Sequence, residues 1–194
     1  MAVSVGYDRL RTWEREPGVS YELRTTNRAG DAARVWNREQ KIVHVPVRGK
    51  WSIYLDGSLT PRVPLRGLVE EWLGSHDMAL FKHPHRDCVY DEIDACLGSG
   101  KITAPQAGRA RAHLMRMGMK RHAGLWACGM LARRVPSALQ GLLAVAWMPP
   151  VREVPRDQLW LPLVLRMSHA EHRVKTIDAD IFDNPWFEFR RHGT

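Results

Sequence analysis

Polar and charged side chains follow two short apolar segments of the sequence, at the points where each segment ends. Residues 51–55 (WSIYL) stop at residues 56–58 (DGS), and residues 78–81 (MALF) stop at residues 82–86 (KHPHR). Both apolar segments have the length and composition of buried strands, and a helical pattern separates them. Open α/β sheets bind ligands at the carboxyl ends of their strands. The sequence therefore predicts a ligand site built from these two strand ends.

Asp56 is the candidate for a metal or ribose contact at the first strand end. Mg²⁺ and Mn²⁺ prefer carboxylate oxygens together with substrate phosphates, and a carboxylate also suits a ribose hydroxyl. The dipeptide Asp56-Gly57 is equally typical of a tight turn, in which both residues serve only the backbone. Taken by itself, the dipeptide favours the turn, so both interpretations stay open.

The candidate anion site at the second strand end consists of Lys82, His83, His85 and Arg86. They precede a predicted helix that Asp87 is expected to cap. Cations beside the free N–H groups of a helix N-terminus suit an anionic ligand such as a diphosphate. Glu92 lies inside the same predicted helix, where it can pair with Arg86 or face solvent.

The cysteines predict neither a disulfide framework nor a recognised metal motif. There are three of them, Cys88, Cys96 and Cys128, and the odd count fits a reducing compartment. A zinc site made by His83, His85 and Cys88 lacks a second pair of ligands at a recognised spacing. We therefore expect no zinc site at that position.

A third polar group, Arg156, Asp157 and Gln158, lies at the start of a predicted helix. The helix dipole favours an acidic residue in the first turn, which is a purely structural reason for Asp157. An Asp–Gln pair after a proline-rich segment could also bind sugar hydroxyls or position a nucleophile. The residue types alone leave both interpretations open.

The composition is that of a globular, basic protein. The 194 residues include 44% hydrophobic residues, and 29 Lys and Arg against 21 Asp and Glu give a formal net charge of +8. This length predicts one domain, residues 1–194, and the charge favours an anionic partner such as nucleic acid or a phosphorylated ligand, although basicity also serves solubility. No signal peptide and no membrane-spanning segment are recognised, so we expect a cytoplasmic location, the host cytoplasm if the protein is phage-encoded.

The helix and strand patterns alternate along the chain, which is typical of an α/β fold. Thr103 and Gln106 fit a capping box. Pro149-Pro150 are expected to close one helix, and Pro162 to kink or shorten the last one. The expected strands are 3–5, 20–25, 51–55, 78–81 and 125–133, and the expected helices are 64–74, 87–97, 103–117, 137–147 and 156–167.

Two further segments are polar or aromatic without a clear period. Residues 26–40 predict a loop, and its arginines suggest a mobile basic flap, with a plain solvated loop as the alternative. Residues 41–47 are open between a strand and a helix end. The aromatic tail, residues 177–194, is expected to pack on the domain. Missing motifs argue against three common classes: P-loop NTPases, hydrolases with a nucleophile elbow, and zinc deaminases.

Together these segments resemble a glycosyltransferase-like family that includes plant proteins of pollen-tube turgor regulation and seed mucilage synthesis, with short bacterial and phage relatives. The agreement in order and spacing extends over residues 7–165. The matching residues are Tyr7, Asp8 and Leu10; Lys41 to His44; Trp51 to Ser58; Lys82 to Arg86 with Tyr90, Glu92 and Ala95; Gly124 and Leu125 with Arg133 and Arg134; Trp147; and Arg156 to Leu165.

The resemblance implies a GT-A-like, Rossmann-like nucleotide-sugar fold with a mostly parallel central sheet flanked by helices. It implies a UDP-linked or other nucleotide-sugar donor and a Mn²⁺ or Mg²⁺ ion at Asp56. Donor-binding residues would be Asp56, Gly57, Lys82, His83, Arg86 and Glu92, and the residues facing the transferred sugar would be Arg156, Asp157 and Gln158. Two departures matter: a D-x-D motif would place an acid at residue 54, which is Tyr54, and the family's Ser-Phe after R-D-Q-L is Trp160-Leu161 in this sequence.

The resulting prediction is a glycosyltransferase that moves a sugar from a nucleotide sugar to a hydroxyl acceptor. The acceptor would be a hydroxymethylated base in DNA, as in phage-type DNA modification, or else a glycan. Asp157 is the residue expected to activate or position the acceptor hydroxyl or the sugar. The alternative is a non-catalytic nucleic-acid-binding module that uses the arginine-rich segment and the basic tail.

Overall fold

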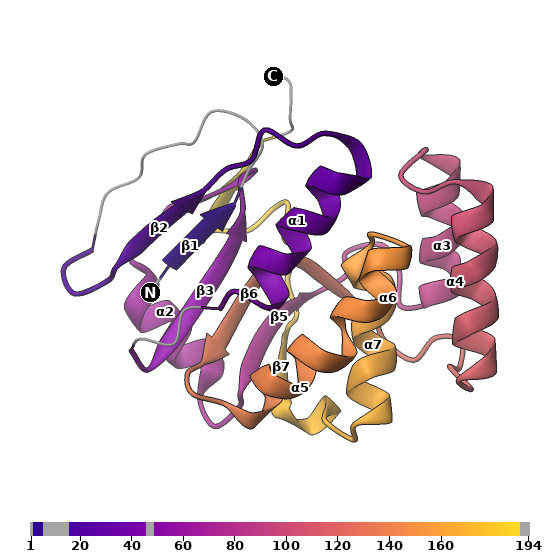
Figure 1. Ribbon diagram of the computed structural model, residues 1–194. Helices are drawn as coiled ribbons and strands as arrows, with labels where there is room; N and C mark the ends of the chain where they lie inside the picture. Colours follow the sequence, from indigo (N-terminus) through magenta and orange to yellow (C-terminus); the bar gives the residue numbers. More distant parts are fainter. Residues whose placement is uncertain (1, 6–15, 46–48, 191–194) are drawn as a thin grey trace.

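A computed structural model describes residues 2–5, 16–45 and 49–190, which form a mixed α/β structure around a six-stranded sheet (Figure 1). The strands are β1 (Ala2–Val5), β2 (Tyr21–Arg24), β3 (Trp51–Asp56), β4 (Leu59–Pro61), β5 (Met78–Lys82), β6 (Trp126–Arg134), β7 (Val174–Ile177) and β8 (Phe187–Phe189). The helices are α1 (Gly30–Ile42), α2 (Leu65–Leu73), α3 (Val89–Gly98), α4 (Ala104–Arg116), α5 (Ala138–Ala146), α6 (Met148–Glu153), α7 (Asp157–Met167) and the 3₁₀ turn η1 (Glu171–Arg173).

The direction of the strands brings the two predicted strand ends to one edge of the sheet. The strand order is β2-β1-β3-β6-β5-β7, and β6 runs antiparallel to both of its neighbours while the other pairs are parallel. The sheet is therefore mixed, with one internal antiparallel strand. Since β3 and β5 both oppose β6, they run in the same direction. Their carboxyl ends lie on either side of the first residues of β6.

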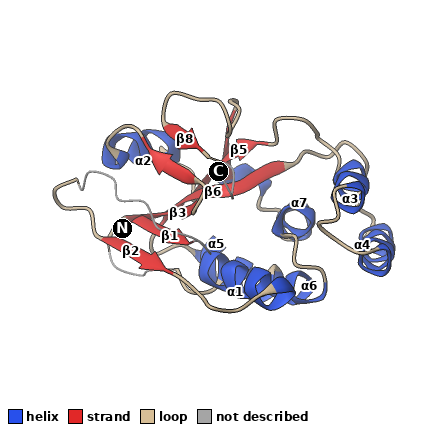
Figure 2. Ribbon diagram, turned by 90° about the horizontal axis from the view of Figure 1, so that it is seen from above, coloured by secondary structure: helices blue, strands red, loops and turns tan. Residues whose placement is uncertain are grey.

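Two hydrophobic cores, one on each face, hold the sheet between its helices. Helices α1, α5, α6 and α7 cover one face, whereas α2 and the small β4–β8 ribbon cover the other (Figure 2). The α3–α4 hairpin lies at the side of the molecule, where α3 packs on α7. Both faces of the central strands are buried, which explains the uninterrupted apolar segments in the sequence.

The C-terminal segment packs on α2 and β5 and contributes structure of its own. Trp186 lies edge-on to Trp72 with ring centroids 5.2 Å apart, and Phe187 lies 6.2 Å from Phe81. Asn184 holds the turn before β8 by accepting the N–H groups of both aromatic residues. Strand β7, which the sequence did not predict, completes the sheet edge beside β5. Residues 191–194 lie outside the described residues.

The prediction of a loop for residues 26–40 is wrong, because α1 begins at Gly30. The residues that α1 buries at a four-residue spacing are Ala33, Asn37 and Lys41, two of which are polar. A polar stripe on the buried face hides the helical period from a search for apolar residues. The expected basic flap is wrong as well, because Arg24 and Arg34 pair with carboxylates nearby.

The structure also tests four expectations about helix caps and prolines. Asp87 does not cap α3, whose N-cap is Cys88 without a side-chain bond. The Pro149-Pro150 pair does not end a helix but lies in the first turn of α6, where a missing N–H is harmless. Helix α7 continues through Pro162, and the Thr103–Gln106 capping box is confirmed. Within the described residues, no helix has both the length and the apolar composition needed to cross a membrane.

Candidate functional site

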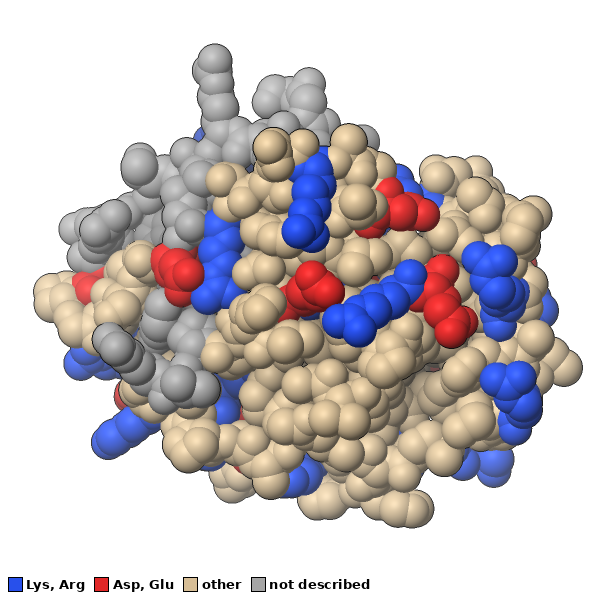
Figure 3. All heavy atoms as spheres, in the orientation of Figure 1, with Lys and Arg blue, Asp and Glu red and all other residues tan. Residues whose placement is uncertain are grey.

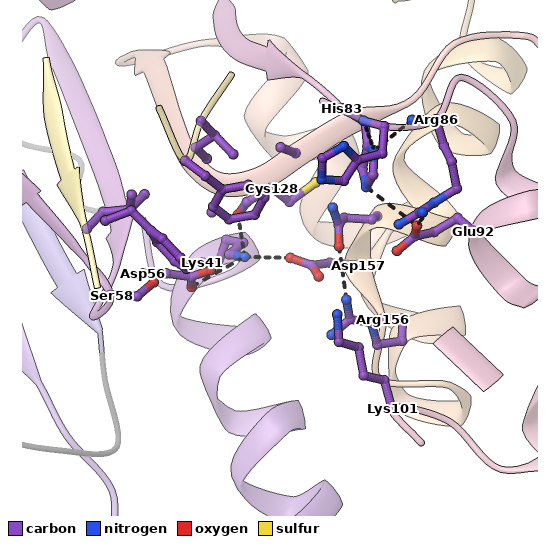
Figure 4. Close-up of a pocket in the computed structure, with 18 of the residues that line it drawn as sticks. Lys41, Asp56, Ser58, His83, Arg86, Glu92, Lys101, Cys128, Arg156 and Asp157 are labelled. Atoms are coloured by element: carbon purple, nitrogen blue, oxygen red, sulfur yellow. Dashed lines mark hydrogen bonds and ion pairs between the residues drawn. The ribbon is translucent and has the colours of Figure 1, made fainter. Parts of the chain in front are cut away.

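A cavity of about 330 Å³ opens at the sheet edge where β3 and β5 end (Figure 4). Its walls come from segments far apart in the sequence: α1, the ends of β3 and β5, the start of β6, the start of α7 and the tail. The lining residues are Arg38, Lys41, Asp56, Ser58, Leu59, His83, His85, Arg86, Glu92, Lys101, Ala127, Cys128, Gly129, Arg156, Asp157, Gln158, Ile181, Phe182 and Phe189. Ligand sites commonly have volumes of roughly 300 to 1,000 Å³, so a small ligand or part of a larger one fits here.

Most of the predicted site residues meet in this cavity, and two do not. Seven of them line it: Asp56, His83, Arg86, Glu92, Arg156, Asp157 and Gln158. Lys82 is exposed and pairs instead with Asp178, 3.4 Å away, because successive residues at a strand end point in opposite directions. Gly57 lies in the turn after β3 and is not a lining residue. Lys82 is therefore not placed to bind a ligand in the cavity.

Lys41 is the centre of a buried charge network that the sequence did not reveal. Its side chain is 1% exposed, and its Nζ donates to Asp157 Oδ2 and to the Cys128 carbonyl, both at 2.5 Å. The same Nζ lies 3.7 Å from Asp56 Oδ1 and 4.8 Å from the centre of the Tyr54 ring. Figure 4 shows the ammonium group between the two carboxylates. Lys41 thus joins α1, β3, β6 and α7.

Asp157 is committed to this network and is not placed to act as a general base. Burial tends to raise the pKa of its carboxyl group, but Lys41, Arg38 and Arg156 together hold that pKa well below its ordinary value. Oδ2 accepts from Lys41 and Oδ1 lies 3.4 Å from Arg38 Nε. A carboxylate that is 2% exposed, doubly paired and this weakly basic does not take a proton from an acceptor. Asp157 is a positioning residue for Lys41.

Asp56 keeps one side of its carboxylate toward the cavity. Tyr54 lies two residues earlier on the same face of β3, and its buried hydroxyl donates to Asp56 Oδ1 at 2.6 Å. Burial and the Asp56 charge raise the pKa of Tyr54 well above its ordinary value, so the phenol keeps its proton. The Asp56 side chain is 31% exposed and is the accessible carboxylate at this end of the cavity.

The divalent cation implied for Asp56 does not fit the side chains around it. Oδ1 already accepts the Tyr54 hydroxyl and faces the fixed positive charge of Lys41. Asp56 belongs to no group of three His, Cys, Asp or Glu side chains close enough to share an ion, within the part of the chain that the structure describes. Residue 54, where a D-x-D motif has its other acid, is a tyrosine. The positive charge beside Asp56 is an ammonium group instead.

His83, Glu92 and Arg86 form a second network at the opposite wall. His83 Nδ1 accepts the backbone N–H groups of His85 and Arg86, which leaves Nε2 to donate toward Glu92 Oε2, 3.4 Å away. Glu92 is buried, and the same Oε2 accepts Arg86 Nε at 2.6 Å. His83 and Glu92 therefore fold the loop after β5 and orient Arg86. The guanidinium of Arg86 is the member of this group that reaches the cavity with substantial exposure.

The state of His83 predicts a loss of stability in mild acid. Burial lowers the pKa of His83, with Glu92 acting in the opposite direction, so the folded protein holds a neutral imidazole. A histidine in the unfolded chain takes up a proton at about pH 6.5, which favours the unfolded chain below that pH. We expect the free energy of unfolding, measured with urea between pH 7.5 and 5, to fall below about pH 6.5. In the variant His83→Asn, whose amide oxygen can accept the same N–H groups, the free energy of unfolding should fall less steeply. In His172→Asn, which changes a surface histidine, it should fall as in the unaltered protein. Equal pH slopes in all three proteins would contradict this role of His83.

The third wall supplies further positive charge and an unsatisfied donor. Arg156 Nη2 donates to Gln158 at 3.0 Å, but its buried Nε has no partner among the described residues. Lys101, from the loop between α3 and α4, lies beside it (Figure 4). Five lining residues are Lys or Arg and three are Asp or Glu, so positive charge is in excess. A buried N–H without a partner next to a cavity favours a ligand that accepts a hydrogen bond.

The rim of the cavity near Asp56 is apolar and partly aromatic. Phe182 and Phe189 lie with ring centroids 4.6 Å apart, and Phe182 is exposed. Gly129 of β6 leaves room there, because a Cβ at this position would lie 3.1 Å from Ile181 and 3.4 Å from Asp56 Oδ2. The cavity thus has an apolar rim beside a carboxylate at one end and three cations at the other.

Sequence reasoning missed Lys41, Arg38, Lys101 and Cys128 as lining residues. Lys41 belonged to a segment that matched the resembling family, but nothing in the local pattern assigned a role to it. Cys128 is fully buried, and burial with the nearby Asp157 raises the pKa of its thiol well above the ordinary value. Cys128 therefore stays a neutral thiol and contributes its backbone carbonyl to the site. The segment with Tyr7 and Asp8 lies outside the described residues.

Comparisons with known proteins give little guidance for this chain. No protein-family model matches it, and no curated protein matches it. Three solved chains match, among them a protein described as the WbbM bifunctional glycosyltransferase in its apo form. That likeness has a TM-score of 0.47 and 12% sequence identity, and it covers 83% of this chain and 28% of the other. The chain spans less than a third of the length of this neighbour, and a likeness of this extent decides neither fold family nor activity.

Proposed function

We propose that the protein transfers a sugar from a nucleotide-sugar donor to a hydroxyl acceptor. The observation that supports this most directly is the convergence of three motifs on one cavity. The segment after β3, the segment after β5 and the start of α7 are separated by tens of residues, yet all three line it. These are the segments in which the sequence resembles a glycosyltransferase-like family. Their convergence is what a donor site requires.

The donor diphosphate would lie against Arg86, Lys101 and Arg156. When the bond between the sugar and the diphosphate breaks, negative charge grows on the departing phosphate, and fixed cations stabilise that charge without reorganisation. Arg86 is already oriented by Glu92, and Arg156 offers an N–H that has no partner among the described residues. Both arginines can form paired hydrogen bonds with phosphate oxygens. This end of the cavity therefore serves the leaving group.

The sugar or its acceptor hydroxyl would lie at the opposite end, next to Asp56. Its free carboxylate oxygen can accept a hydroxyl proton or hold a sugar hydroxyl in place. Lys41 and Tyr54 fix the orientation of this carboxylate. In this arrangement Asp56 takes the role that the sequence assigned to Asp157. Asp157 acts by holding Lys41.

Binding of the donor predicts a shift in thermal stability. We expect one nucleotide sugar in a panel of uridine, guanosine, adenosine and thymidine derivatives to raise the melting temperature by roughly 5 °C or more at saturating concentration. Arg86→Gln and Arg156→Gln should abolish most of that shift. Arg109→Gln, an exposed arginine of α4 outside the cavity, is the matched control and should keep it. If no nucleotide sugar raised the melting temperature, the transferase proposal would fail.

A hydroxymethylated base in DNA is the acceptor that the net charge of +8 favours. Arg109, Arg116 and Lys120 are exposed on and after α4, on the same hairpin as Lys101 of the cavity. A purely nucleic-acid-binding module has less support. The expected arginine flap is a helix, and basic and acidic side chains alternate over the face in Figure 3. Steep salt dependence of acceptor binding would favour DNA, and its absence would favour a neutral glycan.

A further inference from the structure

A second cluster of chemically active side chains lies outside the cavity, where α3 begins. Cys88, Asp91 and His122 place one possible ligand atom each within 4.8 Å of one another. Cys88 is the N-cap of α3, Asp91 lies in its first turn, and His122 comes from the connection between α4 and β6. None of the three lines the cavity. We propose that these residues bind a zinc ion that fastens the connection before β6 to the start of α3.

The distances suit a metal of this size. Three atoms within 4.8 Å of one another surround a point no more than about 2.8 Å from each, whereas zinc bonds are about 2.0 to 2.3 Å long. Each ligand therefore needs to move by less than about 1 Å. Thiolate, imidazole and carboxylate are the three ligand types that zinc uses, and the sulfur and nitrogen ligands disfavour Mg²⁺ and Ca²⁺.

The neighbouring side chains support the ligands. His122 Nδ1 lies 2.7 Å from Asp87 Oδ1, so Asp87 can hold one ring nitrogen while the other binds the metal. A carboxylate behind a ligating histidine is the usual arrangement around zinc. Arg121 Nη2 donates to Asp91 Oδ1 at 2.5 Å, which leaves Oδ2 for the ion. The fourth position would be taken by water. Binding releases the thiol proton of Cys88 to the buffer, so zinc affinity should rise with pH.

The position of this cluster links it to the cavity. The Gly124 N–H donates to the Asp87 carbonyl at 3.0 Å, and the His83 N–H donates to the Leu125 carbonyl at 2.9 Å. Hydrogen bonds therefore join the connection that carries His122 to the loop that carries His83 and Arg86. A metal here would stabilise one wall of the cavity without touching a ligand in it. The inference does not depend on the proposed transferase activity.

Zinc titration of the metal-stripped protein, residues 1–194, tests the proposal. We expect one equivalent to bind in competition with a chromogenic chelator, and the melting temperature to rise by about 5 to 10 °C at zinc concentrations 100-fold above the dissociation constant. Cobalt in place of zinc should show the near-ultraviolet charge-transfer band of a thiolate ligand. This band has to disappear in Cys88→Ser.

Two exposed-site variants keep the test independent of folding. His122→Asn removes the imidazole but tolerates the positive φ of 51° at this residue, and it should weaken zinc binding on the order of 100-fold or more. His172→Asn, a surface histidine outside the cluster, should bind zinc like the unaltered chain. No stoichiometric binding, or an equal rise in melting temperature for His122→Asn and His172→Asn, would overturn the proposal.

Discussion

Replacing Lys41 with methionine is expected to lower the free energy of unfolding by about 3 to 5 kcal/mol. Methionine fills a similar volume but removes the ammonium group that neutralises Asp157 and faces Asp56. Asp157 is 2% exposed, so its charge would remain buried, and the contact to Arg38 is longer, at 3.4 Å. Urea denaturation monitored by tryptophan fluorescence measures the change. Lys120→Met, an exposed lysine, should change the free energy by less than about 0.5 kcal/mol.

A double substitution separates the charge pair from simple packing. In Lys41→Met with Asp157→Asn, the carboxylate that loses its partner is removed as well. The double variant should therefore be less destabilised than the sum of the two single variants, because each single change leaves a buried group unpaired. Strictly additive losses would mean that the 2.5 Å contact between Lys41 and Asp157 contributes no coupling energy.

Replacing Asp56 with asparagine is expected to reduce the rate of sugar transfer by about 100-fold or more while donor affinity changes little. The amide oxygen can still accept the Tyr54 hydroxyl, so the local fold should be kept. The negative charge that would accept or orient a hydroxyl is lost, whereas Arg86, Lys101 and Arg156 stay in place. Steady-state kinetics that separate kcat from the KM of the donor measure this.

The same variant tests the role of a divalent cation. Because Lys41 supplies the positive charge beside Asp56, added Mn²⁺ or Mg²⁺ should not raise donor affinity in the unaltered protein. Asp178→Asn, an exposed carboxylate that contacts Lys82, is the control and should transfer sugar at the normal rate. Full activity in Asp56→Asn would contradict the role of Asp56 in accepting or orienting a hydroxyl. A requirement for Mn²⁺ that Asp56→Asn abolishes would contradict the conclusion that Lys41 supplies the positive charge beside Asp56.

Much of the sheet and the position of the site were predictable from local sequence. Strands β3 and β5 and most of β6 are apolar segments of the right length, and each of β3 and β5 ends at a polar cluster. An apolar segment of four to eight residues next to turn residues has few alternatives to a buried strand. Because the polar clusters directly follow these apolar segments, they lie at the ends of the strands. Strand β7 was missed because it is a four-residue edge strand with two exposed positions.

Helix α1 shows why local pattern was not enough for the cavity wall. Its buried residues include Asn37 and Lys41, which are favourable inside only because Tyr54 and Asp157 meet them there. Asp157 is 116 residues away from Lys41 in the chain. A buried charge is stable only with a partner, and no window of sequence shows that partner.

The sequence by itself determined which residues could do chemistry at the strand ends, because side-chain type and the ends of apolar segments are local properties. It determined that Asp56, His83 and Arg86 follow the ends of two apolar segments that have the length of strands. Only the tertiary structure decided what each group is free to do. Lys82 faces away from the cavity, Asp157 is held by Lys41, and Glu92 with His83 is used to orient Arg86. The reason is that availability depends on partners, and the partners come from distant parts of the chain.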